Sequence, residues 1–245
     1  MSGPRTGFSD DIGDVSLLWW GDDSWTSARG VRESALVQRV IALDMEGVLT
    51  PEIWIAVSEG TGIAELGRTT RDEPDYDALM QYRLDVLAAH DVSLSQIRSV
   101  IAELPLLGGA REFLDELRHR WVVVLLSDTF EQFDDHFLEL MGYPHLLCHR
   151  LDVADDRILG WRRRVHDAKR LAVQAYRDLN YHVTAVGDSY NDLTMLRSAH
   201  AASLFRCPPT LVEANPDLPA MSDYGDLLRW ITDVELQTAD SKRSG

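Results

Sequence analysis

An apolar run that ends in two acids constrains the fold of this chain more than any other feature. The run Val40–Leu43 is followed by Asp44, Glu46 and Gly47. A short run rich in Val, Ile and Leu between turn signals is typical of a buried strand. Ligands of open α/β sheets bind beyond the carboxyl ends of such strands. The pattern therefore predicts a strand over 39–43, with two carboxylates placed over a binding site.

Composition limits the classes of partner that suit this chain. It has 245 residues, of which 45% are hydrophobic, enough for one core or for one core and a small second domain. The formal net charge of −16 makes nucleic acid and anionic membrane surfaces unfavourable partners. No apolar run approaches the roughly 18–20 residues of a membrane span. The two cysteines, Cys148 and Cys207, lie far apart, which favours reduced thiols. Asp10, Asp11 and Asp14 stand where a signal peptide would be basic and then apolar, so we expect a cytoplasmic protein.

Strand and helix patterns alternate from residue 39 onward, which indicates an α/β fold with a parallel, doubly wound sheet. The predicted strands are 39–43, 121–126, 146–148, 183–186 and 201–204, with a turn between short strands over 152–161. The predicted helices are 52–60, 110–120, 130–141, 167–179, 191–198 and 224–234.

The stretch between the first two strands is too long for a simple crossover. Residues 61–107 show helical spacing and contain no convincing strand. We therefore expect an inserted helical cap that covers the carboxyl ends of the strands and excludes water. The predicted organisation is an N-terminal extension at 1–38, a core at 39–50 and 108–235, a cap at 51–107 and a C-terminal tail at 236–245.

The N-terminal extension carries Trp19, Trp20 and Trp25, an unusual aromatic content for a flexible tail. Two alternatives stay open for it. The segment Leu17–Trp25 packs on the core or on a partner subunit, or the extension is mostly disordered. Packing on a second copy would make the protein a homodimer.

Three predicted strands end in polar residues that would meet at one edge of the sheet, and a lysine opens a helix between the last two. These residues are, in chain order, Asp44, Glu46, Ser127, Asp128, Lys169 and Asp188. Phosphoryl transfer through a covalent intermediate needs a carboxylate nucleophile and a second carboxyl group as acid and base. It also needs a hydroxyl and an ammonium for the phosphoryl oxygens, and oxygen ligands for Mg²⁺. The chain offers a candidate for each role.

Over roughly residues 39–235 the chain resembles the haloacid dehalogenase (HAD) superfamily. The four motifs are Asp44-Met45-Glu46-Gly47-Val48, Ser127-Asp128, Lys169 and Gly187-Asp188-Ser189-Tyr190-Asn191-Asp192. Most phosphatases of the superfamily have Asp where this chain has Glu46. That Glu and the following Pro51–Trp54 resemble the ThrH-type phosphoserine phosphatases and homoserine phosphotransferases.

The resemblance implies a Rossmann-like HAD core with a helical cap of the C1 type. It also implies a Mg²⁺-dependent phosphatase that acts through an aspartyl phosphate on phosphoserine or a similar small amino-acid phosphate. Asp44 would be the nucleophile, and Glu46 the general acid and base. Asp44, Asp188 and the backbone carbonyl of Glu46 would bind Mg²⁺.

The remaining roles also follow from the resemblance. The phosphate-binding residues would be Ser127, Asp128, Lys169 and Asn191. Asp192 would orient either the metal shell or Lys169. Within the cap, Glu52 and Arg83 would bind the ammonium and carboxylate of the substrate, because Arg suits a bidentate carboxylate clamp. Arg71 is the second candidate for the carboxylate.

Other functions fit parts of the pattern. The same phosphoenzyme could pass its phosphoryl group to homoserine instead of water. A phospho-acceptor signalling module also combines Asp, Ser and Lys on a doubly wound sheet, but it would lack the cap and the motif at 187–192. An inactive ligand-binding homologue would not need the full polar set.

Two further groups suggest chemistry less strongly. His145, Cys148 and His149 together resemble a metal cluster, but no second ligand pair is evident, and ordinary strand packing explains them better. The basic run 162–164 is interpreted as a solvated or salt-bridged face, with attraction of an anionic substrate as the alternative.

Overall fold

The computed structural model describes residues 38–70, 72–73 and 75–241. Residues 1–37, which carry the tryptophans of the N-terminal extension, lie outside the described residues, and so does Arg71. Among the described residues, no helix is long and apolar enough to cross a membrane.

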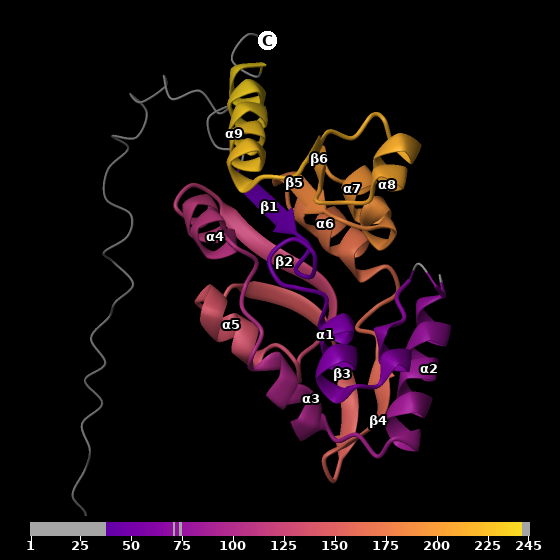
Figure 1. Ribbon diagram of the computed structural model, residues 1–245. Coiled ribbons are helices and arrows are strands. Elements are labelled where there is room, and N and C mark those ends of the chain that lie inside the picture. Colours follow the sequence, from indigo (N-terminus) through magenta and orange to yellow (C-terminus); the bar gives the residue numbers. More distant parts are fainter. Residues whose placement is uncertain (1–37, 71, 74, 242–245) are drawn as a thin grey trace, which may run out of the picture. The chain divides into compact units, whose positions relative to one another are not determined.

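Seven strands form one sheet in the order β4-β3-β2-β1-β5-β6-β7 (Figure 1). Neighbouring strands are parallel except β3 and β4, which form an antiparallel pair at one edge. The strands are β1 Arg39–Leu43, β2 Val122–Phe130, β3 His145–Ala154, β4 Arg157–Arg162, β5 His182–Gly187, β6 Ala201–Phe205 and β7 Ala220–Met221.

The central strand β1 packs into two hydrophobic cores, one on each face of the sheet. Ile41 and Leu43 belong to one core, and Val40 and Ala42 belong to the other. Successive side chains of a strand point to opposite faces, so a strand covered on both sides is apolar throughout. The predicted doubly wound α/β fold is thereby confirmed.

Helices from different parts of the chain cover the two faces. The core that contains Ile41 also receives side chains from α4 Ala110–Arg118, α5 Asp135–Met141 and α9 Tyr224–Ser241. The core that contains Val40 receives them from α6 Ala168–Asp178, α7 Leu193–Ser198 and α8 Pro209–Ala214.

The segment between β1 and β2 is helical, as its spacing predicts. Ahead of α4, it contains α1 Ile53–Thr61, the 3₁₀ turn η3 Ala64–Gly67, α2 Tyr76–Ala89 and α3 Leu94–Ile101. Helix α3 begins with a capping box in which Ser93 and Gln96 satisfy each other's backbone N–H groups. In Figure 1 these helices gather beside β3 and β4, away from α6, α7 and α8.

The predicted helix over 130–141 is wrong at its start. Strand β2 continues to Phe130, which is fully buried and pairs with His149 of β3, and α5 begins only at Asp135. Pairing with β3 therefore overrides the helical spacing that begins at residue 130. The short strands predicted around 146–161 are a longer hairpin, and α8 and β7 were not predicted. Helix α9 continues past the predicted end at residue 234.

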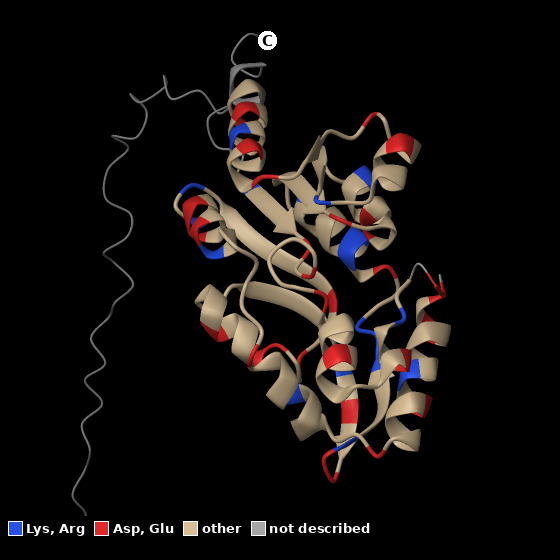
Figure 2. Cartoon of the chain, in the orientation of Figure 1, with Lys and Arg blue, Asp and Glu red and all other residues tan. Residues whose placement is uncertain are grey.

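The basic run 162–164 forms a salt-bridged face, which agrees with the first of the two interpretations given for it. Each arginine meets a different acid: Arg162 with Asp152 at 2.7 Å, Arg163 with Asp77 at 2.8 Å and Arg164 with Glu131 at 2.8 Å. Figure 2 shows acidic residues on most helices of the described part, with basic residues between them. Arg162 therefore pairs within the hairpin, whereas Arg163 and Arg164 connect it to α2 and to the segment after β2.

Candidate active site

A cavity of about 200 Å³ lies at the turn that follows β1. Of the predicted site residues that the structure describes, all line it except Asp192, which is fully buried and accepts a hydrogen bond from Lys169. The predicted residues in the wall are Asp44, Glu46, Glu52, Arg83, Ser127, Asp128, Lys169, Asp188 and Asn191. Side chains to which the sequence analysis gave no role complete the wall: Trp54, Ile55, Thr69, Thr70, Tyr76, Leu79 and Ser189.

Gly47 lets the turns after β1 and β5 approach each other. Its φ is +75°, a left-handed conformation that glycine adopts without steric cost. A Cβ at this position would lie 2.4 Å from Oδ2 of Asp188. The glycine that follows the two acids in the sequence therefore makes room for a third acid from a distant strand.

Asp44, Asp188 and Asp192 form a buried acidic cluster in which one ligand-type oxygen of each lies within 4.8 Å of the others. Burial and the charge of Asp192 raise the pKa of Asp44 well above its ordinary value, although Lys169 opposes this. Burial, together with Asp192, raises the pKa of Asp188 to about 7. Carboxylate oxygens are the ligands that Mg²⁺ prefers. The cluster therefore has an excess of negative charge that a divalent cation would compensate.

Asp192 uses both of its oxygens within the protein. Oδ1 accepts a hydrogen bond from Lys169 at 2.7 Å, and Oδ2 accepts from the backbone N–H groups of Asp188 and Ser189 at 3.0 and 3.1 Å. A Cβ on Gly187 would lie 2.5 Å from the Cβ of Asp192. The position of Asp192 therefore suits orientation of Lys169, one of the two roles predicted for it.

Lys169 joins the ends of three strands. Its ammonium lies 2.9 Å from Asp44 Oδ1, 2.7 Å from Asp192 Oδ1 and 3.3 Å from Asp128 Oδ2. Burial works against the charged form, but these three carboxylates outweigh it and raise the pKa of Lys169 well above its ordinary value. Lys169 is therefore a permanent cation inside the site.

Ser127 and Asp128 stand where β2 loses its regular pairing with β3. Ser127 Oγ accepts the backbone N–H of Thr129 at 3.2 Å, so its own hydroxyl hydrogen is available to the cavity. Asn191 donates to Asp128 Oδ2 at 2.8 Å. Burial disfavours the charge of Asp128, but Lys169, His149 and Asn191 outweigh it and hold its pKa well below the ordinary range.

Glu46 is half-buried in the cavity wall. Its Oε2 accepts the backbone N–H of Ile53, the first residue of α1, at 2.9 Å. Burial raises the pKa of this carboxyl to about 8, and the charge of Glu52 adds to the effect. A carboxyl group that is protonated near neutral pH can first donate a proton and then accept one.

Arg83 reaches the cavity from α2. One guanidinium nitrogen donates to the carbonyl of Arg68 at 2.6 Å, and the group lies 4.6 Å from the centre of the Trp54 ring. Burial lowers the pKa of Arg83, which Tyr76, Glu46 and Glu52 partly offset. Its buried Nε has no hydrogen-bond partner among the described residues. An unpaired buried N–H is rare, so this atom is suited to meet a ligand.

Sequence reasoning missed two side chains that support the site. Tyr76 of α2 donates its hydroxyl to the backbone carbonyl of Asp128 at 2.8 Å, which ties the helical segment to the end of β2. His149, interpreted as an ordinary strand residue, places Nε2 3.3 Å from Asp128 Oδ1. No local spacing signals these contacts, because they depend on how β2, β3 and α2 pack.

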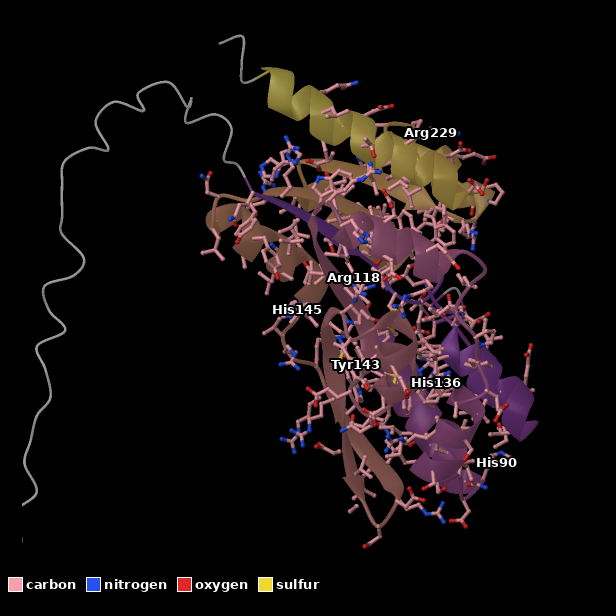
Figure 3. The ribbon with its side chains drawn as sticks, turned by 90° about the vertical axis from the view of Figure 1, so that its left-hand side faces the viewer. His90, Arg118, His136, Tyr143, His145 and Arg229 are labelled. Carbon is pink, nitrogen blue, oxygen red and sulfur yellow. The ribbon has the colours of Figure 1, made fainter. Side chains whose placement is uncertain are left out.

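His145, Cys148 and His149 do not form a metal cluster. His145 is exposed at the start of β3 (Figure 3), whereas Cys148 is buried. In the part of the chain that the structure describes, the only group with metal-ligand geometry is Asp44, Asp188 and Asp192.

A doubly wound sheet whose strand ends bring a carboxylate, a lysine and an acidic cluster together defines a hydrolase of the haloacid dehalogenase type. A model of the haloacid dehalogenase-like hydrolase family matches residues 38–200. The chain belongs to this family and is a HAD-type phosphatase. The predicted resemblance is confirmed.

Two curated relatives are similar over most of the chain. The phosphoserine phosphatase ThrH of Pseudomonas aeruginosa is 51% identical over 191 residues, which cover 78% of this chain and 93% of that protein. The phosphoserine phosphatase of Pseudomonas syringae pv. tomato is 48% identical over 189 residues, or 77% of this chain and 80% of that protein.

A solved structure supports the fold independently. A substrate-bound phosphoserine phosphatase matches with a TM-score of 0.68 at 19% sequence identity, covering 79% of this chain and 98% of that one. At this identity the similarity concerns the fold.

Proposed function

We propose that this protein is a Mg²⁺-dependent phosphoserine phosphatase that works through a phosphorylated Asp44. The observation that carries the proposal is the pairing of two unlike carboxyl groups in one cavity. Asp44 is bound to Lys169, and Glu46 has a pKa of about 8. Such a pair supplies a nucleophile and a proton donor to one substrate. The names of the two relatives support phosphoserine as that substrate.

In the first half-reaction Asp44 attacks the phosphorus atom. The donors Met45 N–H and Lys169 both reach Oδ1, which makes Oδ2 the available nucleophile. As the new bond from Asp44 to phosphorus forms, the bond from phosphorus to the serine oxygen breaks. Protonated Glu46 gives its proton to that oxygen, so serine leaves as a neutral alcohol.

In the second half-reaction Glu46 is a carboxylate and takes a proton from water. The water oxygen attacks phosphorus, the bond to Asp44 breaks, and inorganic phosphate leaves. Ser127, Lys169 and Asn191 hold the phosphoryl oxygens in both steps. Through its side chain Asp128 contributes indirectly, because a carboxylate accepts hydrogen bonds from Lys169 and Asn191 and donates none.

The acidic cluster fits Mg²⁺. We assign Asp44, Asp188 and the backbone carbonyl of Glu46 as its protein ligands, since Asp192 already uses both oxygens. When bound, Mg²⁺ neutralises negative charge around the phosphoryl group. The raised pKa values of Asp44 and Asp188 support this assignment, because they indicate charge that the protein alone leaves uncompensated.

Arg83 and Glu52 would read the amino-acid part of the substrate. Both line the cavity, Arg83 with an unpaired Nε and Glu52 at the residue before α1. They belong to the proposed cap, residues 51–107, which would cover the reacting groups. Transfer to homoserine, a cytoplasmic location and a homodimer stay predictions.

A turnover screen of the full chain tests the proposal. Phosphoserine, phosphoethanolamine and p-nitrophenyl phosphate are incubated with Mg²⁺, with and without homoserine, and both inorganic phosphate and phosphohomoserine are measured. We expect phosphoserine to give the highest kcat/KM, and chelation of the metal to stop turnover until Mg²⁺ is restored. Transfer shows as phosphohomoserine formed in place of phosphate. A stable phosphoprotein without turnover would contradict the proposal and favour a signalling module.

Arg83→Ala tests recognition of the substrate carboxylate. We expect KM for phosphoserine to rise about 10–100-fold, because a charge-assisted hydrogen bond of about 1.5–3 kcal/mol is lost. KM for phosphoethanolamine, which has no carboxylate, should stay close to the wild-type value. Arg83→Lys, which keeps the charge without the planar fork, should lie between. Equal changes for both substrates would remove Arg83 from carboxylate recognition.

A further inference from the structure

His149 is a buried imidazole that the proposed mechanism does not use. It lies on β3 with 2% of its surface exposed, opposite Phe130 of β2. The Trp161 ring packs beside it with 5.9 Å between ring centres. Burial leaves its ring nitrogens to find partners inside the protein, and both do.

The two nitrogens of His149 have different roles. The backbone N–H of Arg164 donates to Nδ1 at 3.3 Å. A backbone N–H is only a donor, so Nδ1 is the acceptor and the ring proton lies on Nε2. Nε2 is 3.3 Å from Asp128 Oδ1. The imidazole therefore presents a fixed donor to that carboxylate.

Arg164 is itself held in place. Its Nε donates to the carbonyl of Cys148 at 2.9 Å, and one terminal nitrogen donates to Glu131 at 2.8 Å. The segment that follows β4 is thereby held against β3 next to His149. The backbone N–H of Arg164 that orients the imidazole therefore belongs to that segment and not to the loops that carry the catalytic residues.

The other oxygen of Asp128 faces the phosphoryl site. Oδ2 accepts from Asn191 at 2.8 Å and lies 3.3 Å from Lys169. Lys169 is also shared with Asp44 and Asp192. An Asp128 that lost its donor on Oδ1 would compete more strongly for Lys169 and draw it away from Asp44.

We propose that His149 is a positioning residue of the phosphoryl site, which acts by holding Asp128 so that Lys169 and Asn191 keep their places. The inference rests on the proposed phosphatase function of this site but not on phosphoserine as the substrate. Its effect should appear in the phosphoryl-transfer rate and in phosphate binding, because the groups it orients contact the phosphoryl oxygens.

Three variants separate the donor from the bulk of the side chain. His149→Gln keeps an N–H at about the reach of Nε2, His149→Asn is too short for Asp128, and His149→Phe fills the space without a donor. With p-nitrophenyl phosphate and Mg²⁺, we expect the Phe and Asn variants to lose about tenfold in kcat, and the Gln variant to stay within about threefold of wild type. The inhibition constant of inorganic phosphate should rise in the same order.

A purely structural role would give a different result. All three variants would then melt at a lower temperature, in proportion to the packing that is lost. The folded protein would keep the wild-type kcat and the wild-type inhibition constant of phosphate. If the Phe variant does not fold, the comparison of the Gln and Asn variants decides. Equal activity of those two would overturn the inference.

A double-mutant cycle and a spectroscopic measurement complete the test. In an Asp128→Asn background, His149→Phe should cause no further loss, because the group that it positions is already changed. The same loss in both backgrounds would overturn the inference.

Nitrogen NMR tests the tautomer of His149, whose signal is assigned by its absence in the Gln variant. We expect the Nε2–H tautomer. The Nδ1–H tautomer would contradict the inference even if no turnover were found. Turnover of p-nitrophenyl phosphate without turnover of phosphoserine would contradict only the proposed substrate.

Discussion

Replacing Asp44 by Asn is expected to lower phosphatase kcat by at least about 10⁴-fold without unfolding the protein. The amide has almost the same shape as the carboxyl group, but it is not a nucleophile and forms no acyl phosphate. In the metal-free protein, burial raises the pKa of Asp44, so its charge is unfavourable to folding at neutral pH. The thermal midpoint of the variant without Mg²⁺ should therefore equal or exceed that of the wild type.

The measurement combines steady-state kinetics with both p-nitrophenyl phosphate and phosphoserine and a thermal melt followed by circular dichroism. Asp226→Asn is a matched control, because Asp226 is exposed on α9 and pairs only locally with Arg229. That variant should keep wild-type turnover. Rapid acid quenching of the wild type followed by mass spectrometry should place a phosphoryl group on the peptide that contains Asp44. Near-normal turnover of Asp44→Asn would exclude the proposed mechanism.

Glu46→Gln is expected to slow the second half-reaction with every substrate, but the first half-reaction only when the leaving group needs a proton. The serine oxygen is a poor leaving group and needs a proton, so kcat/KM for phosphoserine should fall about 10²–10⁴-fold. The p-nitrophenolate ion leaves without a proton, so the first half-reaction should survive with that substrate. The second half-reaction still lacks its base. We therefore expect a burst of p-nitrophenol of about one equivalent per active site, followed by slow turnover.

The pH dependence gives a second measure of Glu46. Its pKa of about 8 means that the proton-donating form predominates below that pH and is lost above it. A cation bound at Asp44 stabilises the charged form of Glu46 and lowers the pKa of Glu46. The value of kcat/KM for phosphoserine should therefore decline with rising pH at or below pH 8. The decline should be absent in Glu46→Gln. Glu59→Gln is a suitable control, since Glu59 is an exposed glutamate on α1. If Glu46→Gln shows no burst and its kcat/KM still declines with rising pH, the proton donor is another residue.

Several features of the site could be read from local sequence. Asp44, Ser127 and Asp188 each follow an apolar run, and parallel strands bring their carboxyl ends to one edge of a sheet. These predictions needed only the periodicity of each strand and the residue that ends it.

Other features could not be read because they depend on pairing between distant segments. Phe130 begins a stretch with helical spacing, yet its pairing with His149 keeps it in β2. The contact of His149 with Asp128 follows from that same pairing. Arg83 looks like a solvated helix residue in sequence, but it is buried against Trp54 from α1.

The sequence by itself determined the class of fold, the family and the acids that line the site, since each of these depends on local runs and on short motifs. Only the tertiary structure decided which carboxyl group holds a proton and which stays charged. That difference comes from burial and neighbouring charge. Glu46 lies in the wall next to Glu52, whereas Asp128 lies between Lys169, Asn191 and His149. A side chain carries its ordinary pKa in the sequence, and the groups packed around it set the value at which it acts.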